Sequence, residues 1–204
     1  MRVISGQWRG RKLAAPKGDA TRPTADRTRE TLFSMLNSRL GSFDGLSVAD
    51  LFAGSGALGL EALSRGAASC LFVEQEKSAQ DAILANIRTL GASGTSLNKG
   101  SVMSLGPVQQ PYDLILLDPP YDTGAGAVAL DRLLRLGWIG DATWMAVETG
   151  AKESVNVAGL EVDAERKVGK VRFQTLPRQC QGGNHRGRYG EAVAVFCIDR
   201  RPRL

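Results

Sequence analysis

The residues of this chain best suited to chemistry are Asp118, Pro119, Pro120 and Tyr121, which follow an apolar run at positions 114–117. A carboxylate and the backbone carbonyl after it can accept hydrogen bonds from an exocyclic amino group, and an aromatic ring can stack on a nucleobase. Each proline fixes φ, removes an N–H donor and restricts the residue before it, so the turn is stiff. A rigid pair of acceptors beside a stacking ring suits methyl transfer to a nucleobase nitrogen.

A second motif lies upstream, where Gly54, Gly56 and Gly59 fall between a predicted strand at 46–52 and a predicted helix at 57–65. Glycines at this spacing let the chain turn tightly and let a ligand approach the backbone. Glu74 follows about 20 residues later, at the end of the next apolar strand, where an acid can bind ribose hydroxyls. Such a turn fits nicotinamide, flavin and S-adenosylmethionine (SAM) alike. The acidic motif at 118–121 makes SAM the best candidate.

Composition favours a single domain with a small appendage, because the chain has 204 residues of which 43% are hydrophobic. Three scattered cysteines form no disulfide framework, and neither they nor the single histidine suggest a metal site. The N-terminus lacks an apolar signal core, and no apolar run approaches the length of a membrane span. We therefore expect a reduced, cytoplasmic and monomeric protein without a metal.

The charge distribution predicts a polyanionic partner. Residues 1–40 carry nine Lys/Arg against three Asp/Glu and residues 165–204 carry ten against three, whereas residues 41–164 carry seven against fifteen. Basic ends of this kind can bind a phosphate backbone, although they can also serve solubility alone. The candidate RNA-binding residues lie in a predicted hairpin at 1–15 and in or before a predicted helix at 24–40: Trp8, Arg9, Arg11, Lys12, Arg22, Arg27 and Arg29.

From residue 46 onward, strands and helices alternate in the way typical of a parallel sheet with crossover helices. Predicted strands at 46–52, 69–74, 96–98, 112–117 and 144–147 are followed by an antiparallel pair within 161–176 that turns at Gly169 and Lys170. A further strand is predicted at 191–198. We divide the chain into a basic N-terminal appendage (1–40), a catalytic domain (41–176) and a basic C-terminal extension of unassigned role (177–204).

The sequence resembles the RsmD family of bacterial 16S rRNA guanine-N2 methyltransferases from Arg2 to about Leu176. The resemblance rests on GQWRGRKL at 6–13, RPTADRTRETLF at 22–33, DLFAGSGALGLEALSRG at 50–66 and DPPY at 118–121. It implies a Rossmann-like class I SAM-dependent methyltransferase with a seven-stranded, mostly parallel sheet that ends in an antiparallel hairpin. It also implies SAM as the methyl donor and a guanine of 16S rRNA, on an assembled or assembling 30S particle, as the acceptor.

Two features depart from the family pattern. Near the end of the third strand the family has Asp or Asn beside the adenine ring, whereas this chain has Ser101 with Val102 next to it. This weakens a side-chain contact to adenine but leaves a backbone contact possible. The region beyond residue 177 has no counterpart in the family pattern.

Each remaining site residue has a hypothetical role. Phe52, Gly54, Ser55 and Gly56 would surround the methionine half of SAM, with Asp50 near its amino group. Glu74 would hold the ribose, with Glu76 as a nearby competitor. Asp118 and the Pro119 carbonyl would accept the two N–H bonds of guanine N2 and direct its lone pair at the methyl group, while Tyr121 stacks on the extruded base.

Three other functions fit parts of the sequence. A DNA adenine-N6 methyltransferase also needs acceptors for an amino group, but only about forty residues precede the core, too few for a target-recognition domain. A nicotinamide oxidoreductase would use the glycine turn and leave the motif at 118–121 unexplained. A catalytically silent RNA-binding factor of ribosome assembly would have no use for a complete set of acceptors.

Overall fold

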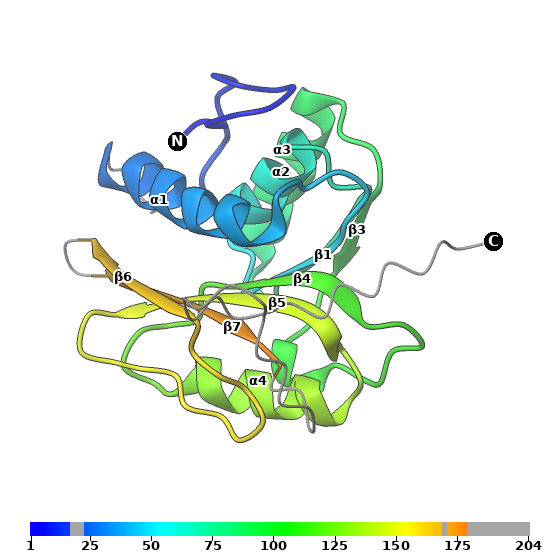
Figure 1. Ribbon diagram of the computed structural model, residues 1–204. Coiled ribbons are helices and arrows are strands. Elements are labelled where there is room, and N and C mark those ends of the chain that lie inside the picture. The colour runs from blue at the N-terminus through cyan, green and yellow to red at the C-terminus, as the bar shows by residue number, and fades with distance from the viewer. Residues whose placement is uncertain (17–22, 169–170, 179–204) are drawn as a thin grey trace.

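The computed structural model describes residues 1–16, 23–168 and 171–178, and its centre is a seven-stranded sheet (Figure 1). The strand order is β3-β2-β1-β4-β5-β7-β6. The strands are β1 (Ser47–Leu51), β2 (Ser69–Val73), β3 (Thr95–Asn98), β4 (Tyr112–Leu117), β5 (Ile139–Gly150), β6 (Ala164–Val168) and β7 (Val171–Pro177). β1 to β5 run parallel, whereas β7 is antiparallel to both β5 and β6.

This sheet confirms the predicted class, and the bounds of β4 agree with the prediction residue for residue. β5 is much longer than the predicted 144–147, since it begins at Ile139 and continues to Gly150. Exposed residues at 141–142 and the polar residues Glu148 and Thr149 flank the apolar run, so that run marked only the centre of the strand. The predicted turn at Gly169 and Lys170 and the predicted strand at 191–198 lie outside the described residues.

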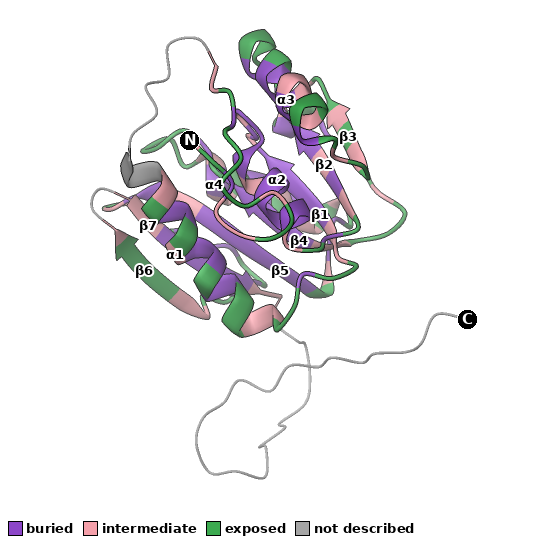
Figure 2. Cartoon of the chain, turned by 90° about the horizontal axis from the view of Figure 1, so that it is seen from above, coloured by how far each residue is buried: buried purple, intermediate pink, exposed green. Residues whose placement is uncertain are grey.

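Helices cover both faces of the sheet. α1 (Pro23–Leu40), α2 (Ala57–Ser64) and α3 (Lys77–Leu90) lie on one face, and α4 (Ala125–Arg135) lies on the other (Figure 1). Alternate residues of each strand face opposite sides, so Leu114 and Leu116 join the core under α1 to α3 while Ile115 and Leu117 join the core over α4. Burial is concentrated along this central layer (Figure 2).

The helix signals in the sequence are confirmed where they can be checked. Leu32, Phe33 and Leu36 of α1 are fully or almost fully buried, as the apolar stripe predicts. α3 ends at Gly91, which adopts a left-handed conformation with φ of 63°. The helix after β1, α2, ends at Ser64, within one residue of the predicted 57–65.

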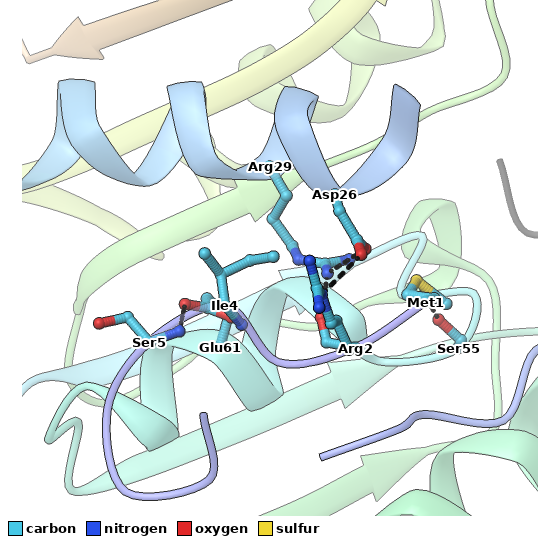
Figure 3. A network of polar contacts seen from close by, with 8 residues as sticks. All are labelled: Met1, Arg2, Ile4, Ser5, Asp26, Arg29, Ser55 and Glu61. Atoms are coloured by element: carbon cyan, nitrogen blue, oxygen red, sulfur yellow. Dashed lines mark hydrogen bonds and ion pairs between the residues drawn. The ribbon is translucent and has the colours of Figure 1, made fainter. Parts of the chain in front are cut away.

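The predicted hairpin at 1–15 is present as a short antiparallel pairing. Arg2 and Lys12 form an antiparallel bridge, and backbone hydrogen bonds join Val3 N–H to the Arg11 carbonyl at 2.9 Å and Leu13 N–H to the Met1 carbonyl at 3.1 Å. The backbone of this segment is also held by a side chain of α2 (Figure 3): Glu61 accepts hydrogen bonds from the N–H groups of Ile4 and Ser5, at 2.7 and 3.0 Å. These contacts between distant parts of the chain leave no local sequence signal, so hairpin periodicity could not reveal them.

Candidate active site

A cavity of about 510 Å³ opens where β1, β2, β3 and β4 end. Carboxyl ends of parallel strands are where open α/β sheets bind ligands. Its lining combines three acids with polar, apolar and small residues: Phe52, Val73, Glu74, Gln75, Glu76, Gly100, Ser101, Val102, Asp118, Pro119, Pro120 and Tyr121. The structure therefore brings Glu74 and Asp118 to one cavity although they lie 44 residues apart in the sequence.

Glu74 joins the glycine turn to the end of β2. One carboxylate oxygen accepts the Gly54 N–H at 2.7 Å, and the other accepts the Glu76 N–H at 2.8 Å. Glu74 is 8% exposed and lines the cavity. Each carboxylate oxygen has a further acceptor position, so Glu74 can fix the loop and still bind a hydroxyl group. Glu76, the predicted competitor, also lines the cavity.

The glycine turn itself is partly strained. Phe52 lines the cavity with a positive φ of 58°, which is uncommon for an aromatic residue. Gly54 has a φ of 55°, and a Cβ built on it would meet no atom within 4 Å, so this position faces open space. An open, left-handed backbone position beside the cavity is what close approach of a ligand to the main chain requires.

Ser55 and Gly56 are placed differently from our expectation, because neither lines the cavity. Ser55 is 8% exposed, and its carbonyl accepts a hydrogen bond from the Asn86 side chain at 3.0 Å. A Cβ on Gly56 would lie 3.2 Å from both Ile83 and Phe72, so this glycine permits close packing of the turn against α3 and β2. Of the predicted wall, Phe52 alone is among the lining residues.

Asp50 also departs from its predicted role. Its side chain is 1% exposed and lies beneath the turn, where one oxygen accepts the Gly59 N–H at 2.7 Å. That N–H belongs to the first turn of α2, whose N-cap residue, Gly56, has no side chain to satisfy it. Burial raises the pKa of Asp50 to about 8 against the lowering effect of this bond, and the charge of Glu74 adds to the rise. Asp50 therefore supports the loop from below.

The turn that follows β4 carries the acceptors. The backbone N–H of Asp118 extends the pairing with β1 by bonding to the Leu51 carbonyl at 3.4 Å. Pro119 is buried, whereas Asp118 and Pro120 are exposed at the cavity. The Thr123 hydroxyl donates to the Pro120 carbonyl at 2.7 Å and so closes the turn. The prolines and this bond fix the position of the carboxylate relative to the sheet.

Two acids that the sequence analysis missed hold the same turn. Glu153 accepts the backbone N–H groups of Asp122 and Gly124, at 2.8 and 3.1 Å. Glu148, in β5, accepts the hydroxyl of Tyr121 at 2.5 Å. Burial, this hydrogen bond and the nearby carboxylates raise the pKa of Tyr121, while burial raises the pKa of Glu148. The phenol therefore stays neutral and acts as a donor.

The predicted RNA-binding residues differ in their exposure. Arg9, Lys12 and Arg27 are exposed, as is Arg11, whose guanidinium also bonds the Thr89 carbonyl at 2.7 Å. Trp8 is half-buried and packs against the core. Arg22 lies outside the described residues.

Arg29 corrects the prediction of an RNA-facing residue on α1. It is 5% exposed, and its guanidinium bonds the Arg2 carbonyl and the Asp26 carboxylate (Figure 3). Burial lowers its pKa, and the carboxylates of Glu61 and Asp26 oppose that effect. Arg29 therefore ties the N-terminal segment to α1 and is not available to a phosphate.

Within the described ranges, no group of three or more His, Cys, Asp or Glu side chains could hold a metal ion. Over the same residues, no helix is both long and apolar enough to cross a membrane.

Comparison with known proteins places these features in a family. Residues 1–176 match the family described as "Conserved hypothetical protein 95". The "Ribosomal RNA small subunit methyltransferase D" of Escherichia coli K12 is 36% identical over 185 residues, which cover 89% of this chain and 92% of that protein. The protein of the same name from Haemophilus influenzae is 36% identical over 154 residues, covering 73% and 78%.

Solved structures agree with this sequence match. A structure of Escherichia coli yhhF, described as a methyltransferase, has a TM-score of 0.77 at 35% identity and covers 89% of this chain and 99% of its own. A Synechocystis magnesium protoporphyrin IX methyltransferase with bound SAM has a TM-score of 0.57 at 14% identity, covering 79% and 87%, and shows the shared fold alone. The chain belongs to the RsmD family of methyltransferases.

Proposed function

We propose that this protein transfers a methyl group from SAM to the exocyclic N2 of a guanine in 16S rRNA. The observation that carries the proposal is the meeting of Glu74 and Asp118 in one cavity, with Tyr121 at its edge. Glu74 offers acceptors suited to a nucleoside, and Asp118 offers acceptors suited to an amino group. The names of the Escherichia coli and Haemophilus influenzae relatives supply the substrate class.

The lining of the cavity fits SAM. Glu74 would accept ribose hydroxyl groups, and the open backbone at Gly54 leaves room for the amino-acid portion. Ser101 and Val102 would hold the adenine, with Val102 supplying an apolar surface. The Ser101 hydroxyl already accepts the Met103 N–H at 3.2 Å and can still donate its own proton. Bound there, SAM supplies an electrophilic methyl group on a positively charged sulfur.

The residues after β4 would prepare the acceptor nitrogen. Guanine N2 is a poor nucleophile because its lone pair is delocalised into the ring. When Asp118 and the Pro119 carbonyl accept its two N–H bonds, the nitrogen becomes pyramidal and its lone pair turns out of the ring plane. These acceptors sit on a rigid turn, so they need little reorganisation during the reaction. The N–H proton becomes acidic once the new bond forms, and the carboxylate of Asp118 or water then takes it.

Tyr121 and the basic surface would bring the base to this site. A guanine must leave its stack to reach the cavity, and stacking on an aromatic side chain contributes about 1–3 kcal/mol per base. Tyr121 is 43% exposed, so its ring is accessible to an incoming base. Arg9, Arg11 and Lys12 are exposed together on the N-terminal segment and would contact RNA phosphates, in an assembled or assembling 30S particle.

Methyl transfer from radiolabelled SAM to 30S subunits, naked 16S rRNA and DNA, each with a no-enzyme control, tests the proposal. Digestion of the labelled product to nucleosides identifies the modified atom. We expect label in N2-methylguanosine from 16S rRNA and none in DNA. Label in N6-methyladenine would favour a DNA adenine methyltransferase, and the absence of label in every substrate would favour a silent assembly factor.

A further inference from the structure

Glu148 lies next to the predicted acceptor turn although it is thirty residues away in the sequence. Leu117 of β4 pairs with Val147 of β5 in parallel register, so Asp118 and Glu148 follow as the next residues of neighbouring strands. Asp118 and Tyr121 line the same cavity, and the charges of Asp118 and Glu148 both act to raise the pKa of Tyr121. Glu148 reaches the edge of the cavity through Tyr121, whose hydroxyl bonds its carboxylate at 2.5 Å.

The hydrogen bond from the Tyr121 hydroxyl to Glu148 restrains the ring and not the backbone of the turn. The backbone is fixed separately, by Glu153 through the N–H groups of Asp122 and Gly124 and by Thr123 through the Pro120 carbonyl. The Tyr121 side chain is 43% exposed, so packing alone leaves its χ1 and χ2 angles incompletely restrained. The hydrogen bond from this hydroxyl to Glu148 would select one ring orientation.

Glu148 is also unusually placed for an acid with only a structural role. It is a half-buried acid, an arrangement that costs free energy unless the group is well hydrogen-bonded. Burial raises its pKa, and the Tyr121 bond opposes that rise. An apolar residue in β5 would avoid this cost but would leave the phenol hydroxyl without an acceptor. The acid is therefore best explained by what it does for the ring.

We propose that Glu148 is a positioning residue that holds the ring of Tyr121 in the orientation required to stack on the target base. The inference rests on the proposed function, because it gives Tyr121 a base to stack on. A ring held in place before binding does not lose rotational freedom when the base arrives, so the gain appears in productive placement of the base. Affinity for the rest of the RNA depends on phosphate contacts elsewhere and should not change.

A double-mutant cycle with Tyr121→Phe, Glu148→Ala and the combined variant tests this proposal on 30S subunits. Each single change should lower kcat about tenfold, the size expected for one hydrogen bond to a charged group. The combined variant should also lose about tenfold and not a hundredfold, because either change alone already breaks the bond. KM for 30S subunits and Kd for SAM should remain within about twofold of wild type.

Glu148→Gln is the conservative variant, since its amide oxygen still accepts the tyrosine hydroxyl. It should recover most of the rate lost in Glu148→Ala. Glu161→Ala serves as a matched control, because Glu161 is an exposed acid in the loop before β6. Thermal unfolding of each variant separates loss of fold from loss of placement, and Tyr121→Phe and Glu148→Gln change almost no volume.

Independent losses that multiply to about a hundredfold in the combined variant would overturn the proposal. An unchanged kcat in Glu148→Ala would do the same, as would a Glu148→Gln variant no better than Glu148→Ala. The proposed function fails separately: it fails if wild-type protein places no label in N2-methylguanosine. Wild-type labelling without coupling between Tyr121 and Glu148 would leave the function standing and remove this inference alone.

Discussion

Asp118 is the residue whose side chain most directly touches the proposed chemistry. It is exposed at the cavity, directly after the four fully buried residues that end β4. We expect Asp118→Ala to lower kcat by at least about a hundredfold, the usual cost of removing one preorganised group from a transition state. Kd for SAM should stay nearly unchanged, because the change removes no contact predicted for that ligand. Single-turnover kinetics and calorimetry measure the two quantities.

Glu74 should show the opposite pattern. Glu74→Gln keeps one oxygen acceptor and replaces the other oxygen with an NH2 group, which is only a donor. The glutamine side chain therefore cannot accept hydrogen bonds from both the Gly54 and the Glu76 N–H. We expect Kd for SAM to rise about tenfold or more, with a smaller effect on kcat at saturating SAM. Gln75→Ala, a neighbouring change in the cavity lining, is the control. Unchanged calorimetric affinity in Glu74→Gln would remove Glu74 from the SAM site.

Asp50 makes stability depend on pH. Its pKa is about 8 in the fold against an ordinary value of 3.8, so between these values the folded state binds a proton that the unfolded state lacks. Stability contributed by this residue is therefore lost as pH rises from about 4 to about 8, by up to roughly 1.4 kcal/mol per pH unit. Asp50→Asn, which stays neutral, should flatten that slope in urea unfolding at pH 5.5, 7 and 8.5. An equal slope in both proteins would contradict the assignment.

At the scale of elements, the N-terminal segment depends on Glu61. This residue of α2 is 1% exposed and accepts the backbone N–H groups of Ile4 and Ser5 while pairing with Arg65. Glu61→Ala would leave these donors and a half-buried guanidinium without an acceptor, so we expect a loss of about 2–4 kcal/mol in the free energy of unfolding. Asp81→Ala, which breaks an exposed pair with Lys77, should cost under about 1 kcal/mol.

The same segment presents the basic surface. Arg9 is exposed next to Gly10, where an added Cβ would meet no atom within 4 Å, so a phosphate can approach both residues. Arg9→Glu should raise KM for 30S subunits and lower the dependence of binding on salt by about one phosphate contact. Arg135→Glu on α4, on the other face of the sheet, is the matched control. Equal effects of the two reversals would show that Arg9 contributes general charge only.

Across the whole molecule, the sequence predicted what depends on local pattern. Buried strands such as β4 and amphipathic helices such as α3 have clear periodicity, and the strand-end motifs at Gly54 and Asp118 follow from the topology of a parallel sheet. Residues whose role depends on a distant partner could not be assigned. Arginine is usually a surface residue, yet Arg29 is buried and donates a hydrogen bond to the Arg2 carbonyl.

Glu148 and Asp50 illustrate the same limit at the site. Asp50 precedes a glycine turn and suggested a ligand contact, but its carboxylate accepts the Gly59 N–H at the start of α2, where the absence of a Cβ leaves room for it. Glu148 lies in an apolar strand and gives no motif, because its meaning depends on the register between β4 and β5. Strand order and register would have to be known before either role could be inferred.

The account depends on Asp118 and Tyr121 acting on a guanine amino group. Mass spectrometry of nucleosides from 30S subunits, treated with wild-type protein or Asp118→Ala in the presence of methyl-labelled SAM, tests it most directly. The account predicts label in N2-methylguanosine with wild type and at least about a hundredfold less with the variant. Label on a different atom, or equal label in N2-methylguanosine from both proteins, would contradict it.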